Sequence, residues 1–230
     1  MSSTWLISSV PMPWIPLAIA GDGGYASRLV VGARESRAVG VVRAAGGDPS
    51  IQTSDFFLVE PKPTYTAVIG NPPYLRYQDF SGDARARSRE AALRAGITLS
   101  GLASSWAAFT VHSALMLQKV GRLGLIIPAE LPSVNHATEV RRFHFEKFAH
   151  VDLVLFTERV FPEVQEEVVL LLADGCEEGG TKHASIYQAQ NAAVLSGTLA
   201  ATTWSSTDAR KSASAFASSL PSSRLSRQSM

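Results

Sequence analysis

The sequence predicts an α/β domain built on a mainly parallel sheet that helices cover on both faces. Short apolar segments typical of strands alternate with longer segments of helical periodicity, as in parallel sheets. The chain has 230 residues, 46% of them apolar, which suits one domain with a sizeable core. The last two predicted strands are close enough in sequence to form an antiparallel hairpin at the edge of the sheet.

The N-terminal region begins with an apolar stretch at 5–20, which prolines at three positions interrupt. No basic segment precedes it and it is too broken for a spanning helix, so we interpret it as a lead-in without a membrane role. A glycine-dense turn at 21–24 precedes a predicted helix over 25–35 and a strand over 37–42. Because the stretch before the turn is short, we expect this part of the domain to be atypical or incomplete.

The central elements have clear boundaries. Two consecutive prolines, Pro72 and Pro73, end one apolar strand because neither can donate to a β-ladder. The segment 81–94 is polar and rich in arginine, which predicts a loop. Strands are predicted at 51–54, 64–70, 123–127, 151–156 and 168–172, and helices at 104–119 and 136–148.

The composition changes after about residue 180, and the stretch 205–230 is rich in serine and alanine. Such a stretch cannot bury enough apolar surface to fold. We therefore predict one domain over 1–180 and a tail over 181–230 that is largely disordered.

Charge and cysteine content limit the classes of function. The net charge is +1, so any contact with nucleic acid must come from a local basic patch. The single cysteine, Cys176, excludes an internal disulfide framework and a multi-cysteine zinc site. One cysteine fits a reducing cytoplasm, where we expect the protein to be located. The histidines show no metal-ligand spacing, so no metal is expected.

Four residues, Asn71-Pro72-Pro73-Tyr74, follow the predicted strand 64–70 directly. Ligands of open α/β sheets bind outside the carboxyl ends of strands. The Asn71 side-chain oxygen and the Pro72 carbonyl could accept both hydrogens of a planar NH₂ group, on a loop that Pro73 stiffens. Tyr74 offers an aromatic face for stacking on a base. The simpler alternative is a rigid turn after a strand.

Residues 66–77, which contain these four, resemble the catalytic motif of the adenine-N6 DNA methyltransferases of restriction-modification systems. The order downstream is similar too: an apolar helix, the segment 121–128, a strand, then Val160-Phe161-Pro162 and a closing strand. The resemblance covers about 20–175. It implies a Rossmann-like methyltransferase sheet, S-adenosylmethionine as cofactor, double-stranded DNA as partner, and methylation of the N6 amine of a flipped adenine.

The resemblance also implies roles for single residues. Asn71, Pro72 and Tyr74 would grip and stack the flipped adenine, and Phe161 would pack on its other face, although a core phenylalanine in a loop is an alternative. An acidic residue after the third strand binds the cofactor's adenine amine in this family, with an apolar neighbour against the ring. A capped turn is the alternative for that acidic residue. The residues that match the cofactor positions are Gly21, Asp22, Gly23, Asp55 and Phe56.

Two family features are missing. The family has an acidic-Pro pair before the glycine loop, where this chain has the apolar residues 17–20. It also has an acidic residue after the second strand, where this chain has Val42-Arg43. Both departures bear on cofactor affinity.

Basic residues after the motif either contact DNA phosphates or belong to a solvated loop. They are Arg76, Arg85, Arg87 and Arg89. Farther along, Arg141, Arg142 and Lys147 are predicted to lie on the exposed face of a helix.

Three hypotheses about the function of the chain remain open. The first is adenine-N6 methylation of DNA in a restriction-modification system, with a separate target-recognition chain or module because none follows the catalytic part. The second is methylation of a protein glutamine, whose amide presents the same planar NH₂ group. The third is an inactive remnant that binds nucleic acid or a partner subunit.

Overall fold

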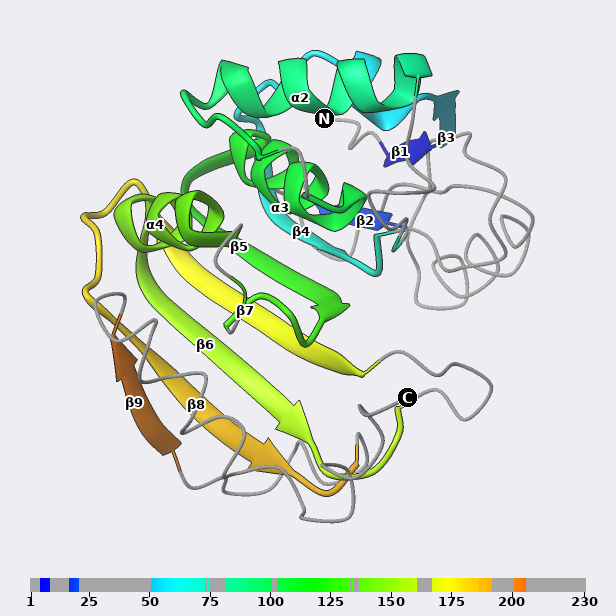
Figure 1. Cartoon of the computed structure of the whole chain (residues 1–230). Coiled ribbons are helices and arrows are strands. Elements are labelled where there is room, and N and C mark those ends of the chain that lie inside the picture. Colours follow the sequence, from blue (N-terminus) through cyan, green and yellow to red (C-terminus); the bar gives the residue numbers. More distant parts are fainter. Residues whose placement is uncertain are drawn as a thin grey trace, which may run out of the picture.

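A seven-stranded mixed sheet forms the centre of the computed structural model (Figure 1). The structure describes residues 5–8, 17–20, 51–72, 74, 82–100, 103–132, 134, 137–160, 167–191 and 201–205. In spatial order the strands are β2 (Leu17–Ala20), β4 (Tyr65–Gly70), β5 (Leu117–Pro128), β7 (Val168–Cys176), β6 (Phe148–Phe156), β8 (His183–Ala189) and β9 (Ala201–Ser205). A separate parallel pair consists of β1 (Trp5–Ser8) and β3 (Ile51–Ser54).

Four strands of the large sheet run in one direction, because β4 is parallel to β5, β6 is parallel to β8, and β7 is antiparallel to both β5 and β6. The strands β2 and β9 pair antiparallel with β4 and β8. The predicted antiparallel hairpin of β6 and β7 is therefore confirmed. Its edge position is corrected, because β7 returns between β5 and β6 and buries Val169, Leu171 and Ala173 there.

The predicted tail also needs correction within the described residues. β8 and β9 lie inside 181–230, where we expected disorder, and β8 pairs with β6 over five residues. Ala184 and Ala189 of β8 are buried. Small side chains are therefore sufficient to form a strand here, because the neighbouring strand β6 supplies the backbone hydrogen-bond partners.

Three helices, α2 (Gly82–Arg94), α3 (Ser105–Leu115) and α4 (Thr138–Lys147), lie on one side of the sheet, and α2 packs on α3 (Figure 1). Within the described residues this differs from the expected cover on both faces. The opposite face exposes Ile69 and Leu172, which flank Gly124 of β5. The predicted helix at 25–35 lies outside the described residues.

Two boundaries differ from prediction. The segment 81–94 is mostly the helix α2, because it is rich in alanine and arginine, which favour helices, and it buries Ala91 and Ala92. The helix predicted at 104–119 ends at Leu115, since Leu117 pairs with Tyr65 and begins β5. Tertiary pairing there outweighs the helical pattern of the following residues.

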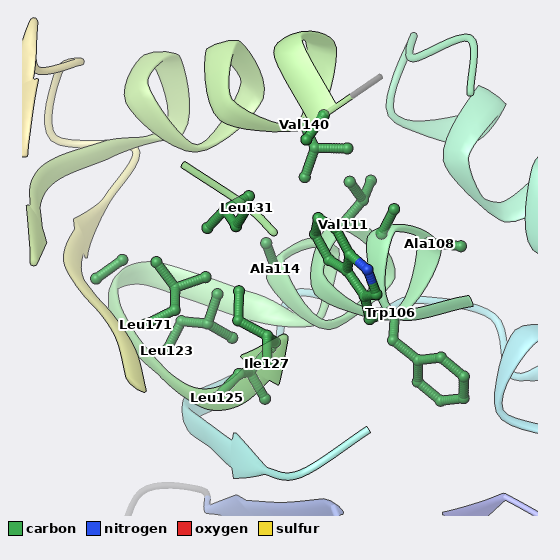
Figure 2. Packing of buried hydrophobic residues seen from close by; sticks show 14 of the residues in the cluster. Trp106, Ala108, Val111, Ala114, Leu123, Leu125, Ile127, Leu131, Val140 and Leu171 are labelled. Atoms are coloured by element: carbon green, nitrogen blue, oxygen red, sulfur yellow. The ribbon is translucent and has the colours of Figure 1, made fainter. Parts of the chain in front are cut away.

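The core lies between the sheet and α3, whose side chains are nearly all buried. Trp106, the largest fully buried side chain, packs in the middle of this layer. Figure 2 shows α3 and α4 above the buried face of β5, with Trp106, Val111, Val140, Leu123, Leu125 and Ile127 converging. The alternation of buried and less buried residues along β5 fixes which of its faces meets the helices.

Two histidines belong to this core. Burial lowers the pKa of His112 and of His144 to about 4. The His112 Nε2 atom lies 3.0 Å from the Val59 carbonyl oxygen, and the His144 Nδ1 atom 2.7 Å from that of Val140. Both imidazoles are therefore neutral at pH 7, in line with the structural role expected for them.

A buried guanidinium fixes the segment after β5. Arg141 is 4% exposed, and its Nη1 atom donates to the carbonyls of Leu131 and Val134, each at 2.8 Å. Its Nη2 atom donates to the Thr138 hydroxyl at 2.9 Å. The predicted exposed face is thus wrong for Arg141, because buried carbonyls after β5 need donors.

The prediction for the other two basic residues has a mixed outcome. Lys147 is also not on an exposed face, because its side chain is mostly buried and pairs with Glu177. Arg142 is exposed as predicted and pairs with Glu139.

We predict that the free energy of unfolding falls as the pH decreases from about 6.5 to about 4. The unfolded chain binds protons on these histidines in that range while the folded chain does not, so each contributes up to ~1.4 kcal/mol per pH unit. Urea unfolding at several pH values measures the slope. His144→Leu should make it shallower and His183→Gln, at an exposed site, should not. An unchanged slope in His144→Leu would contradict this assignment.

We also predict that Arg141→Ala lowers the free energy of unfolding by ~2–4 kcal/mol, because the buried carbonyl of Leu131 and the partly buried carbonyl of Val134 lose their donor. Arg142→Ala is the matched control, since its ion pairs are exposed and contribute little. Thermal or urea unfolding of both variants tests this. Equal stability of the two variants would show that Arg141 does not hold the segment.

Candidate functional site at the carboxyl ends of β4 and β5

Asn71 follows the last residue of β4 directly, next to the end of β5. Gly70 pairs with Leu125 in the parallel ladder, so the carboxyl ends of the two strands lie side by side. The motif therefore lies where ligands of α/β sheets bind, as its position in the sequence predicts.

The Asn71 side chain is held inside the protein. It is 4% exposed, and its Oδ1 atom accepts a hydrogen bond from the Tyr74 hydroxyl. The same hydroxyl lies 2.9 Å from the carbonyl oxygen of Ile126 in β5. Tyr74 thus ties the loop after β4 to the neighbouring strand.

This arrangement engages the oxygen that we predict to accept a substrate amine. A hydroxyl carries one proton, so it donates to either Asn71 or Ile126 at a given moment and not to both. Pro72 is buried beside Asn71. Tyr74 is half-buried and packs against the core. The stacking of its ring on a target base stays a prediction.

Asp55 is the second candidate site residue, and it follows β3. Its Oδ1 atom accepts the Phe57 backbone N–H at 3.0 Å and caps the short helix η1 (Phe56–Leu58). Its Oδ2 atom accepts the Arg87 Nε–H at 2.9 Å, and the Asp55 side chain is 15% exposed. The turn cap that we considered as an alternative role is therefore present. A carboxylate can accept about four hydrogen bonds, so this cap is compatible with binding a ligand amine.

Phe56 directs its ring into the core. The ring is fully buried and stacks on Phe109 with centroids 4.9 Å apart. Its contact with a cofactor ring stays a prediction, because in this conformation the ring faces lie among core residues such as His112.

The other predicted residues divide into two groups. On α2, Arg89 is exposed, Arg85 is half-buried and Arg87 pairs with Asp55. The residues Gly21, Asp22, Gly23, Pro73, Arg76 and Phe161 lie outside the described residues.

The described residues of the chain contain no group of three or more histidine, cysteine, aspartate or glutamate side chains that could hold a metal ion. Among them, no helix has the length and apolar character to cross a membrane.

Sequence reasoning missed two contacts in the site. It did not connect Tyr74 with the Ile126 carbonyl, which lies 52 positions later. It also did not connect Arg87 with Asp55, 32 positions earlier. The helical spacing of Arg87, Ala91 and Arg94 was the available signal, since it places two arginines and a buried alanine on one face of a helix.

Comparison with known proteins agrees with the motif. Residues 44–161 match the model of the Eco57I restriction-modification methylase family. The chain is 28% identical over 123 residues to the type II methyltransferase M.HincII of Haemophilus influenzae. The aligned region covers 53% of this chain and 24% of that protein. It therefore spans about a quarter of the length of such curated relatives.

Solved structures agree with the fold. The type IIG restriction endonuclease BpuSI superposes with a TM-score of 0.52 at 15% identity, over 71% of this chain and 22% of that one. A protein described as a class I S-adenosylmethionine-dependent methyltransferase, from Listeria monocytogenes, gives 0.50 at 15% identity, over 71% and 49%. The predicted Rossmann-like methyltransferase fold is thereby confirmed. Since the family model matches just over half of its residues, this chain belongs to the Eco57I restriction-modification methylase family.

Proposed function

We propose that this chain is the catalytic part of a DNA methyltransferase that transfers a methyl group from S-adenosylmethionine to the N6 amine of adenine. The observation that carries the proposal is the place of Asn71 and Pro72 at the end of β4, beside β5, in a chain of this family. The family supports methylation within restriction-modification. Adenine as the target follows from the chemistry of the motif.

The chemistry required is the orientation of a weak nucleophile. The lone pair of an adenine amine is delocalised into its ring. Acceptors at Asn71 Oδ1 and the Pro72 carbonyl would bind both amine hydrogens and favour a more tetrahedral nitrogen. S-adenosylmethionine, when bound, would supply an electrophilic methyl group. Asn71 and Pro72 would hold the amine nitrogen so that its lone pair is directed at that group, and the nitrogen would release one proton to solvent after the transfer.

Substrate binding is accompanied by a change at Tyr74 in this proposal. Its hydroxyl occupies one of the two acceptor positions of the Asn71 oxygen, and we expect Tyr74 to turn away as the amine binds there. The side chain that turns away can then lay its ring on the flipped base. Flipping costs a few kcal/mol, and stacking would offset ~1–3 kcal/mol of it.

Of the residues proposed to bind the cofactor, Asp55 and Phe56 lie in the described part of the chain, and Asp55 would provide the polar contact. Its partly exposed carboxylate lies at the end of β3, where it can accept a hydrogen bond from the cofactor's adenine amine. A preset acceptor of this kind suits a ligand that presents an N–H donor. The glycine loop at 21–23 would hold the methionine part.

Partners and location follow from the same proposal. The enzyme would act on double-stranded DNA in the cytoplasm. A separate specificity chain or recognition module would choose the sequence. Exposed Arg89 and half-buried Arg85 on α2 would add a salt-dependent attraction to phosphates.

A methyl-transfer assay separates the open readings. The purified chain, labelled S-adenosylmethionine and either unmethylated genomic DNA or a glutamine-bearing peptide are combined, and the products are analysed by mass spectrometry. N6-methyladenine is the expected product. N5-methylglutamine would favour the protein substrate, and absence of both products together with absent cofactor binding would favour an inactive remnant.

We predict that Asn71→Ala abolishes transfer to DNA without changing the fold, because the amine loses its side-chain acceptor. The loss should be at least about 100-fold in rate, as for other preorganised hydrogen-bond groups. Circular dichroism and the labelled-methyl assay measure both properties. Activity within tenfold of the unaltered chain would refute the amine-gripping role.

We predict that Tyr74→Ala weakens binding of an extrahelical base by ~1–3 kcal/mol. The measured quantity is the difference in affinity between duplexes with a mismatched and a matched adenine. Tyr74→Phe is the matched control, since it keeps the ring and removes the hydroxyl bonds to Asn71 and Ile126. If the alanine and phenylalanine variants lose the same affinity, stacking is not the contribution of this residue.

A further inference from the structure

The turn that carries Asp55 is held from outside by two helices. Arg87 of α2 bonds the Asp55 carboxylate at 2.9 Å. Arg94, about two helical turns later on α2, donates to the Phe57 carbonyl at 3.4 Å, and His112 of α3 contacts the Val59 carbonyl. The turn is therefore fixed at three alternate positions, 55, 57 and 59, of which only the first involves a predicted ligand-binding group.

The helix that supplies Arg87 is itself well anchored. Ala91 and Ala92 are fully buried and Ser88 is 2% exposed. These residues pack α2 on α3, so Arg87 is presented from a fixed backbone. The Arg87 side chain is one-third exposed and pairs with the partly exposed Asp55 carboxylate.

We propose that Arg87 is a positioning residue for cofactor recognition: it orients the Asp55 carboxylate toward the adenine amine of the cofactor. This inference rests on the proposed function. One Asp55 oxygen is fixed by the Phe57 N–H and the other by Arg87, so the carboxylate plane is set before the ligand arrives. Preorganisation of this kind improves affinity because less conformational freedom is lost on binding.

The proposal assigns Arg87 to the cofactor and not to DNA phosphates. The chain between Asn71 and Arg87 would then serve both substrates, because Asn71 would bind the target amine and Arg87 would orient the carboxylate that binds the cofactor. The Asp55 carboxylate itself discriminates against a ligand that presents an acceptor in place of the amine, because an ionised carboxylate has no proton to donate to that acceptor.

The test uses two ligands that differ at one group. S-adenosylhomocysteine carries the amine, and S-inosylhomocysteine has a carbonyl at the same ring position. Isothermal titration of the full chain measures the dissociation constant of each. Arg87→Ala should raise the constant for the first about five- to tenfold, which is ~1.0–1.4 kcal/mol, and change that for the second less than about twofold. Arg87→Lys should recover part of the loss.

A mutant cycle separates positioning from general stabilisation. In an Asp55→Ala background, Arg87→Ala should have no further effect on the affinity for S-adenosylhomocysteine, because the residue through which it acts is absent. Arg142→Ala, an exposed arginine of a helical ion pair on α4, should leave both constants unchanged. Circular dichroism verifies that each variant is folded.

The outcomes distinguish this inference from the proposed function. If Asp55→Ala weakens S-adenosylhomocysteine but Arg87→Ala does not, or weakens both ligands equally, Arg87 has no positioning role and the proposed function stands. Tighter binding by Arg87→Ala would show that the ion pair competes with the cofactor and would overturn the inference. If the unaltered chain binds neither ligand at millimolar concentration, both proposals fail.

Discussion

The parallel pairing of β4 with β5 is the constraint on which the candidate site depends. It aligns Gly70 with Leu125 and so brings the residue after one strand, Asn71, next to the end of the other. Tyr74 joins the two by contacting the Asn71 side chain and the Ile126 carbonyl. The buried residues of β5 in turn fix the sheet against α3. A register change of one residue would turn Leu123, Leu125 and Ile127 away from that helix, so core packing and site geometry are maintained together.

The features that local sequence determines were predicted. The proline pair ends β4, the apolar runs give β3 to β7, and the motif lies at the end of a strand. Family membership followed from residues 66–77, because a rigid motif carries its chemistry in adjacent positions. The features that depend on distant pairing were not predicted. To predict that β7 lies between β5 and β6, one would have to know which strand edges are left unpaired by the rest of the sheet. Similarly, β8 forms a strand because β6 offers it backbone hydrogen-bond partners.

The arginines illustrate the same limit for the site. Sequence alone gives Arg87, Arg141 and Arg142 one interpretation, a solvated or phosphate-binding charge. In the structure one pairs with a candidate ligand-binding carboxylate, one donates to buried carbonyls, and one remains exposed. The three roles differ because different acceptors lie near each guanidinium in the folded chain. A guanidinium has five N–H donors and can bond to carboxylates, hydroxyls and backbone carbonyls alike. Asp55 likewise combines a turn cap with an ion pair, which is compatible with either of the roles that the sequence left open.

The central claim is that the Asn71 oxygen exchanges the Tyr74 hydroxyl for a substrate amine. A structure of the chain with S-adenosylhomocysteine and a duplex that carries a mismatched adenine tests it most directly. The account predicts the adenine N6 atom at about 2.7–3.2 Å from both Asn71 Oδ1 and the Pro72 carbonyl oxygen, with the Tyr74 hydroxyl displaced and its ring on the base. An extrahelical adenine bound elsewhere, with Tyr74 still bonded to Asn71, would contradict it.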